Sequence, residues 1–317
     1  MFDPEVPIDD QGVVYHIAAK SADIANKIIL VGDPGRVPVV AQYFDKGSIT
    51  FDHAHREIRS ITGTYKGDRM TVMSSGMGTD NIEIILHEIH ILKEYNVTTK
   101  TWCKKEDIPK VLIIRVGTCG SPRPEADVKV GSLAVSRYSI GMDNTGSYYN
   151  VDYSADENIG RLVKALQSTS LAQMMPYVSA ADPEVIAALQ SAGGRVATTR
   201  KVITGVTASG SGFYGCQGRL VGRIGPTVRI PNLVDILSGL ELTTTTGDTV
   251  KVSNIEMETS SLFRLSNILG YRSGAVCSII AKRAGQVREF ASAEESKASI
   301  ACGITTALEA LRSFASS

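Results

Sequence analysis

The ten residues V-L-I-I-R-V-G-T-C-G (Val111–Gly120) decide the fold class of this chain. Val111–Val116 is apolar and rich in β-branched residues, with the single exception of Arg115, and therefore predicts a buried strand. The glycines and Thr118 that follow predict a loop at its carboxyl end. In open α/β sheets ligands bind beside the carboxyl ends of the strands, so the same stretch predicts where a binding site lies.

Short strand-like runs alternate with segments of helical periodicity along the rest of the chain. The predicted strands are Ile28–Val31, Arg69–Met73, Val111–Val116, Ser132–Val135, Lys201–Thr207 and Ala275–Ile280. The predicted helices are Asn81–Tyr95, Asn158–Leu171, Pro183–Ser191, Glu258–Leu269 and Lys297–Phe314. This alternation predicts an α/β fold with a buried, mostly parallel sheet.

No break in the alternation marks a domain boundary, so residues 1–317 are predicted to form one domain. Two polar stretches, Asn96–Lys110 and Gly239–Lys251, are predicted to be surface insertions.

The charges of the chain are balanced, with 33 basic and 33 acidic residues. No overall field therefore attracts nucleic acid or an anionic membrane, and any anion site must be local. No apolar run approaches the roughly 18 residues that span a bilayer, so no membrane-spanning segment is expected.

The five cysteines are an odd number and include no C-x-x-C pair. This pattern argues against a disulfide framework and against a structural zinc site. The histidines of Leu86–His90 are three residues apart, so the H-E-x-x-H metal motif is not met, and no metal site is predicted. The amino-terminal residues lack a signal-peptide pattern, and a cytoplasmic protein is expected.

Three loops after predicted strands have the composition of anion sites. Gly32–Arg36 combines glycines with an arginine, and Ser74–Asn81 leads through glycines into a helix amino terminus. Arg115, with Thr118 close by, lies in an apolar strand, where an unpaired charge is costly and a bound anion would be a natural partner. The alternatives are a tight turn, a capped helix start and an internal ion pair with a glutamate, respectively.

Two acids, Glu256 and Glu258, precede a predicted helix. The helix dipole favours carboxylates there, so one of them is expected to cap the helix. The other could accept hydrogen bonds from vicinal hydroxyls such as those of a ribose. Paired acids are also typical of glycosidases, but that chemistry would leave the anion loops unexplained.

The stretch G-F-Y-G-C-Q-G-R-L-V-G (Gly212–Gly222) offers a planar ligand three kinds of contact. Phe213 provides a stacking face, Gln217 a donor and an acceptor, and Arg219 a planar fork of donors. The edge of uracil, with its N3–H donor and its O2 and O4 acceptors, matches this set. The alternative is a surface hairpin in which these residues have no shared role.

Five motifs in order resemble the nucleoside phosphorylases, and among them the uridine phosphorylases of eukaryotic type. They are G-D-P-x-R (Gly32–Arg36), G-M-G with L-H-E (Gly76–Gly78, Leu86–Glu88), R-x-G-T (Arg115–Thr118), F-Y-x-x-Q-G-R (Phe213–Arg219) and N-I-E-M-E (Asn254–Glu258). The resemblance covers most of the chain and implies one domain in which helices flank a central mixed, largely parallel twisted sheet. Asp80-Asn81 departs from the pattern after the glycine loop.

The resemblance also implies roles for individual residues. The implied phosphate ligands are Gly32, Arg36, Arg115, Thr118 and, from a neighbouring subunit, Arg56. The implied ribose ligands are Met257, Glu256, Glu258 and, from the neighbour, His16. The implied base-binding residues are Phe213, Gln217, Arg219, Ile280, Ala281 and Arg283. Arg115, Gln217, Arg219 and Glu258 would carry the catalysis.

The implied activity is that of a pentosyltransferase in pyrimidine salvage, which reversibly cleaves uridine and deoxyuridine with phosphate to give uracil and a pentose 1-phosphate. Phosphate is a co-substrate, and no other cofactor is implied. Shared sites imply a homo-oligomer, and polar insertions longer than those of shorter bacterial relatives favour a dimer. The alternatives are a purine nucleoside or methylthioadenosine phosphorylase, a nucleosidase, and a non-catalytic nucleoside-binding protein. The acid-free stretch Gly274–Ala281 favours a pyrimidine base over a purine.

Overall fold

The predicted strands lie at the centre of a 12-stranded sheet in a computed structural model of the chain, which describes residues 4–124, 128–150, 156–284 and 288–315. The strand β7 (Leu112–Ser121) runs parallel to β1 (Lys27–Val31) on one side and to β13 (Arg272–Lys282) on the other. On its other side β1 pairs in parallel with β4 (Asp68–Ser74). All five residues of β1 are buried, as expected for a strand covered on both faces.

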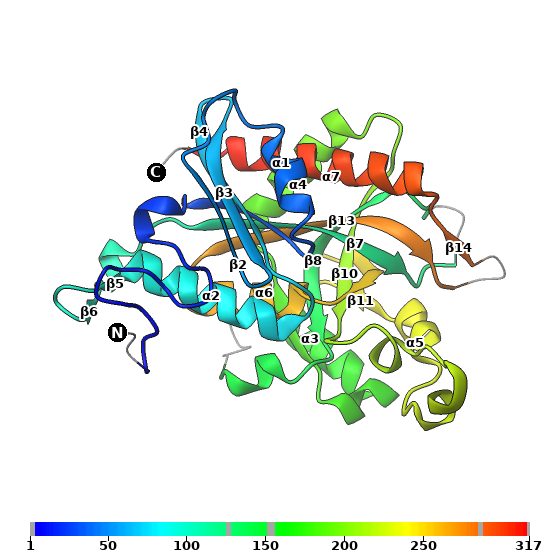
Figure 1. Cartoon of the computed structure of the whole chain (residues 1–317). Helices are drawn as coiled ribbons and strands as arrows, with labels where there is room; N and C mark the ends of the chain where they lie inside the picture. Colours follow the sequence, from blue (N-terminus) through cyan, green and yellow to red (C-terminus); the bar gives the residue numbers. More distant parts are fainter. Residues whose placement is uncertain (1–3, 125–127, 151–155, 285–287, 316–317) are drawn as a thin grey trace.

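The other strands extend this centre in both directions. They are β2 (Phe51–His55), β3 (Ile58–Tyr65), β8 (Leu133–Gly141), β9 (Tyr177–Ala180), β10 (Val202–Ser209), β11 (Glu241–Thr243), β12 (Thr249–Glu256) and β14 (Glu289–Phe290). The order is β11-β12-β10-β8-β13-β7-β1-β4-β3-β2, with β9 beside β8 and β14 beside β13. Figure 1 shows β7, β13 and β10 in the middle of the molecule and β2, β3 and β4 at one side.

One further pairing closes part of the sheet into a ring. Ile255 of β12 pairs antiparallel with Gly120 of β7, close to the carboxyl end of each strand. The strands β12, β10, β8, β13 and β7 thus form a closed circuit. Because the ends of β7 and β12 meet, the segments that follow them are brought together.

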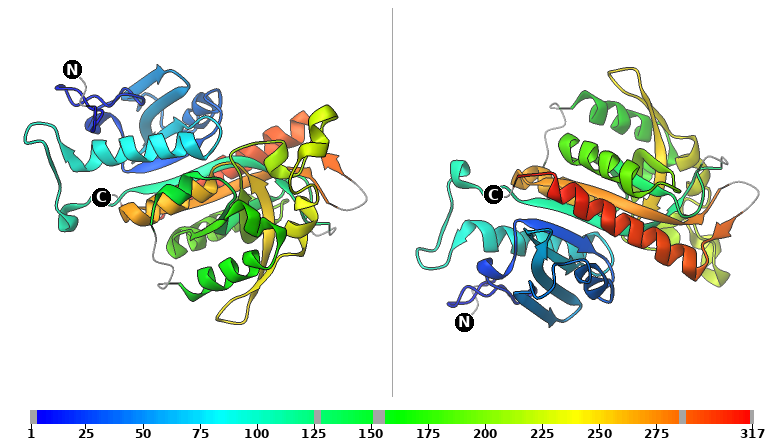
Figure 2. Two further views of the ribbon diagram at one scale, coloured as in Figure 1. Left: turned by 90° about the horizontal axis from the view of Figure 1, so that it is seen from below. Right: turned by 90° about the horizontal axis from the view of Figure 1, so that it is seen from above.

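Helices cover both faces of the sheet. They are α1 (Arg36–Ala41), α2 (Thr79–Glu94), α3 (Glu157–Gln167), α4 (Pro183–Val196), α5 (Leu233–Gly239), α6 (Thr259–Leu269) and α7 (Ala293–Arg312). Ile114 of β7 faces the core that contains α4 and α7, whereas Ile113 faces the core of α2 and α6. Successive strand residues point to opposite faces, so one apolar strand supports both layers (Figure 2). The predicted α/β fold, with a mixed, largely parallel sheet flanked by helices, is confirmed.

The helices begin where the sequence supplies caps. Asp182 accepts hydrogen bonds from the backbone amides of Glu184 (2.9 Å) and Val185 (3.0 Å) at the start of α4, and Ser292 caps α7 in the same way. The helix α2 instead follows Gly78, whose φ of +98° suits glycine and few other residues. In the part of the chain that the structure describes, no helix combines the length and apolarity needed to cross a bilayer.

One of the two predicted surface insertions, Gly239–Lys251, is mostly exposed but is also part of the sheet. In Gly239–Lys251 the strand β11 pairs antiparallel with the start of β12, and the paired residues Leu242 and Val250 are buried. The segment is therefore an edge of the sheet, which the run of threonines between its apolar residues concealed. Asn96–Lys110 is largely exposed, as predicted, and holds a small hairpin of β5 (Tyr95–Asn96) and β6 (Thr101–Trp102).

Candidate active site

A cavity of about 720 Å³ opens at the carboxyl ends of β1, β7 and β12, bounded by the loop after β10. It collects most of the predicted site residues from segments far apart in the sequence. These are Gly32, Arg36, Arg115, Thr118, Phe213, Gln217, Arg219, Glu256, Met257, Glu258, Ile280 and Ala281. The position agrees with the rule that ligands bind beside the carboxyl ends of strands.

One end of the cavity is cationic. Arg36 follows the turn after β1, and Arg115 projects from β7, with Thr118 three residues further on. Burial lowers the pKa of Arg36, and the nearby charge of Arg115 lowers it further. Two guanidinium groups held this close make a site for an anion.

Arg115 is paired with both predicted acids. It contacts the Glu258 carboxylate directly, and its Nη2 lies 3.4 Å from Glu256 Oε2. Burial alone would lower the pKa of Arg115, but the two carboxylates raise it above its ordinary value, so the guanidinium stays charged. The internal ion pair weighed from the sequence is therefore present, and it lies inside the cavity.

The two acids differ in their surroundings. Glu256 accepts hydrogen bonds from the amides of Glu258 and Thr259, each at 3.1 Å, and so caps α6, and Ser209 donates to it as well. Burial raises the pKa of Glu258, while the charge of Arg115 opposes that shift. The helix cap expected of one acid is provided by Glu256, whereas Glu258 contacts the Gly78 amide through Oε1 and Arg115 through Oε2. A ligand that binds Glu258 must therefore share or replace one of these partners.

The glycine loop before α2 also faces Glu258. The amide of Gly78 donates a hydrogen bond of 2.8 Å to Glu258 Oε1. Asn81 donates to the Met77 carbonyl at 3.0 Å, and both residues line the cavity. The amide at this helix start thus meets a carboxylate of the protein, not a free anion as the glycine motif alone suggested.

Three residues of the loop Gly212–Gly222, namely Phe213, Gln217 and Arg219, also line the cavity. The buried Gln217 receives a hydrogen bond of 2.9 Å from Arg219 on its Oε1 and donates one of 3.2 Å from its Nε2 to the Gly212 carbonyl. The Arg219 guanidinium lies over the ring of Phe213, with 3.8 Å between its Cζ and the ring centroid. The side chains that the sequence grouped are therefore in contact with one another.

The wall beside this loop comes from the end of β13. A register shift between Ile279 and Ala281 forms a bulge at Ile280, and both Ile280 and Ala281 line the cavity. Bulges re-aim side chains at functional sites. Arg283 lies just beyond, and its Nη1 is 3.4 Å from Gln217 Oε1.

Besides Arg283, two predicted residues, His16 and Arg56, do not line the cavity of this chain. His16 contacts Glu88 through its Nδ1 at 2.7 Å, and Arg56 donates to the Tyr15 hydroxyl at 3.0 Å. Both were assigned to a neighbouring subunit's site, so their absence from this cavity leaves that assignment a prediction.

Sequence reasoning missed several residues that line the cavity. They are Asp33, Pro34, Glu57, Gly76, Met77, Asn81, Gly117, Cys119, Gly120, Ile255 and Phe290. Most are neighbours of motif residues and could have been included on that ground. Phe290 is different, because β14 brings it next to Ala281 by a pairing that no motif signals.

Comparisons with known proteins identify the family of the chain. The profile of the Phosphorylase superfamily matches residues 26–316. A uridine phosphorylase of Thermococcus kodakarensis is 31% identical over 299 residues, which are 93% of this chain and 86% of that protein. A DeoD-type purine nucleoside phosphorylase of Geobacillus stearothermophilus is 34% identical over 152 residues, 48% of this chain and 58% of that protein.

A solved structure is similar over almost the whole chain. It is a Trypanosoma brucei nucleoside phosphorylase described as showing uridine phosphorylase activity, and it is 41% identical with a TM-score of 0.90. The alignment covers 98% of this chain and 100% of that one. These matches show that the chain belongs to the Phosphorylase superfamily.

Proposed function

We propose that this protein catalyses the reversible phosphorolysis of uridine to uracil and ribose 1-phosphate, with 2′-deoxyuridine as a second substrate and pyrimidine salvage as its role. The observation that carries the proposal is the combination of groups that line one cavity. Arg36 and Arg115 provide cations, Glu258 a carboxylate against Arg115, and Gln217 with Arg219 a set of donors and an acceptor. This combination matches phosphate, ribose and uracil in the substrates.

The relatives support the same substrates. Both the Thermococcus kodakarensis protein and the Trypanosoma brucei structure carry a uridine phosphorylase description. The DeoD-type relative is named for purines, so the base must be decided by the site itself. Uracil is favoured because Gln217 and Arg219 match its edge, and the Gly274–Ala281 wall offers no acid to support protonation of a purine N7.

The proposed reaction is a displacement at C1′ of the ribose. A phosphate oxygen forms a bond to C1′ while the bond from C1′ to uracil N1 breaks, and that electron pair leaves with the base. Arg219 stabilises the negative charge that develops on the uracil carbonyls, and the bound phosphate stabilises the positive sugar. Holding both reactants in line supplies much of the remaining acceleration, and no cofactor is needed beyond phosphate.

Substrate binding would exchange partners within the ion pair. In the free protein Arg115 and Glu258 neutralise each other. Phosphate would take over the charge of Arg115, which frees Glu258 to accept hydrogen bonds from the ribose 2′- and 3′-hydroxyls. The two ligands therefore need to arrive together for both buried charges to keep partners.

The proposal includes a homodimer. His16 and Arg56 lie outside the cavity of their own chain and would complete the site of the partner, with His16 at the ribose 5′-hydroxyl and Arg56 at the phosphate. A closed, two-fold interface gives each site the same pair of residues.

The first test is loss of uridine absorbance with and without inorganic phosphate, with inosine run in parallel. We expect uridine cleavage that requires phosphate and little cleavage of inosine. Cleavage without phosphate would make the protein a hydrolase, and a preference for inosine would overturn the assignment of Gln217 and Arg219 to uracil.

A second prediction concerns Gly117, which lies under the side chain of Arg115. A Cβ at this position would come 1.7 Å from Arg115 Nη1 and 2.7 Å from its Cζ. The Gly117→Ala variant must displace the guanidinium. We therefore expect the KM for phosphate to rise about tenfold, which corresponds to the loss of about one charge-assisted hydrogen bond between Arg115 and phosphate.

The melting temperature of Gly117→Ala should fall as well, because the displaced guanidinium is buried and paired with Glu256 and Glu258. Gly160→Ala is the matched control, since a Cβ there meets no atom within 4 Å. An unchanged phosphate KM in Gly117→Ala would remove Arg115 from the phosphate site.

A further inference from the structure

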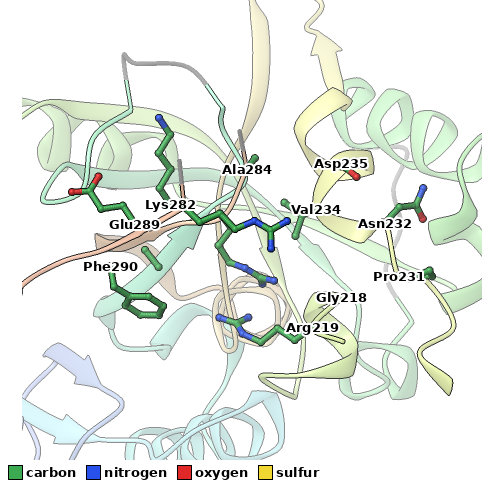
Figure 3. Close-up of a pocket in the computed structure, with 13 residues that line it drawn as sticks. Gly218, Arg219, Pro231, Asn232, Val234, Asp235, Lys282, Ala284, Glu289 and Phe290 are labelled. Carbon is green, nitrogen blue, oxygen red and sulfur yellow. The ribbon is translucent and has the colours of Figure 1, made fainter. Parts of the chain in front are cut away.

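A second cavity, of about 390 Å³, adjoins the base end of the active-site cavity. The two share Arg219, Ala281 and Phe290 as lining residues. In Figure 3 the guanidinium of Arg219 reaches into this second cavity, and Asn232 and Val234 of the segment around α5 stand on its far side. Arg283 and Arg288 line only the second cavity.

This second cavity holds three guanidinium groups without a matching carboxylate. Among the described residues, no ion pair joins an acid to Arg219, Arg283 or Arg288. Burial, together with the charges of Arg219 and Arg288, lowers the pKa of Arg283 to about 10. Arg219 and Arg283 are half-buried, and Arg288 is exposed beside them. The like charges of the two half-buried arginines stay costly until an anion joins them.

The acids on the cavity's rim do not fill that need. The carboxylate of Glu289 points away from Arg219 in Figure 3, on the side where Lys282 also extends outward. Asp235 comes from α5 on the opposite wall and is exposed. The arginines are thus left available to an anion that enters from outside or from the active site.

The position of the second cavity restricts what such an anion can be attached to. Its lining includes none of the residues proposed to bind phosphate or ribose, so it lies beyond the base as seen from the sugar. In uracil, O4 is the carbonyl oxygen farther from the ribose, and C5 is the ring carbon bonded to C4, which carries O4. With O4 directed to Arg219, a substituent on C5 would point toward Arg283 and Arg288.

From this juxtaposition we propose that the second cavity is a subsite for an anionic substituent on the pyrimidine base, so that the protein accepts uracil compounds carrying a carboxylate at C5. The inference rests on the proposed function, because it needs the base at Gln217 and Arg219. It adds a substrate class, a 5-carboxylated pyrimidine, in which the carboxylate joins the arginines by charge-assisted hydrogen bonds.

The experiment compares the binding of uracil-5-carboxylate and uracil-5-carboxamide by isothermal titration calorimetry. The two probes have nearly the same shape and differ in charge at neutral pH. Arg288→Gln removes a guanidinium that belongs to the second cavity alone. We expect the preference for the carboxylate, measured as the ratio of the two dissociation constants, to fall about fivefold in this variant and further in Arg288→Glu. Using the ratio of the two dissociation constants cancels any effect on uracil binding itself.

Arg223→Gln is the matched control, because it removes an equal charge from an exposed residue that lines neither cavity. Its preference should equal that of the unmodified protein. Equal preferences in Arg288→Gln, Arg288→Glu and the control would overturn the subsite.

Uridine turnover, measured alongside, separates the two proposals. If the Arg288 variants retain uridine turnover and prefer the carboxylate as strongly as the unmodified protein does, only the subsite is refuted. If the unmodified protein neither cleaves uridine nor binds uracil, the proposed function is refuted and the subsite with it.

Discussion

Replacing Arg219 with alanine is expected to lower kcat/KM for uridine by about 10²- to 10³-fold, the usual effect of removing one donor that stabilises charge in a transition state. Arg219 is held in place by Gln217 and by the ring of Phe213, so its donors are oriented before the substrate arrives. The Arg219 side chain therefore does not have to be ordered during the reaction, and its charge can stabilise the departing uracil at once.

The fold of the Arg219→Ala variant should be intact. Arg219 is only half-buried and takes part in no ion pair among the described residues, so its removal leaves no charge unpaired. The melting temperature and circular dichroism spectrum check this. Unchanged turnover in a folded variant would contradict the assignment of this loop to the base.

Arg219→Lys separates charge from geometry. Lysine keeps the positive charge but lacks the planar fork that can meet a carbonyl while still contacting Gln217. We expect most of the activity to be lost in this variant as well. Full activity in Arg219→Lys would mean that only the charge matters.

The loop residues show how far sequence reasoning can reach. Phe213, Gln217 and Arg219 are close in sequence, so their contact could be predicted from one short motif. Arg36 and Arg115 are far apart in sequence, but Arg36 follows β1 and Arg115 lies in the neighbouring parallel strand β7. The carboxyl ends of such strands lie at one edge of the sheet. Local composition and the α/β rule were sufficient for these two groups.

The sequence could not predict that the loop residues and the two arginines line one cavity. This arrangement depends on the pairing of Ile255 with Gly120, which closes the strand circuit and places Glu258 against Arg115. A single antiparallel pair of this kind leaves no pattern in the sequence. For Arg115, burial predicted that a partner must exist, but not whether it would be an anion or a glutamate. The structure shows the glutamate within the cavity where phosphate is proposed.

The second cavity could not be predicted from the sequence either. Arg283 was implied as a base-binding residue, but Arg288 forms no motif with Arg219 and was not singled out. The edge strand β11 was missed for a different reason, because its leucines are spaced by polar residues in a threonine-rich run. Both cases depend on pairings between segments and not on local composition.

Replacing Glu258 with alanine is expected to lower kcat/KM for uridine by about 10²- to 10³-fold. The carboxylate is proposed to accept hydrogen bonds from two ribose hydroxyls, and each bond to a charged group contributes about 1.5–3 kcal/mol. The variant also leaves Arg115 with Glu256 at 3.4 Å as its remaining acid and takes away the acceptor of the Gly78 amide. Melting temperatures of Glu258→Ala and Glu258→Gln will measure these structural costs.

Comparing uridine with 2′-deoxyuridine distinguishes a direct contact from an effect through Arg115. Deoxyuridine lacks the 2′-hydroxyl, so the unmodified protein makes only one of the two hydrogen bonds to it. The fold-loss in kcat/KM caused by Glu258→Ala should therefore be about ten times smaller for deoxyuridine than for uridine. Equal losses for the two nucleosides would mean that Glu258 serves only to hold Arg115. In that case phosphate KM, and not nucleoside KM, would carry the change, because Arg115 lies at the phosphate end of the cavity.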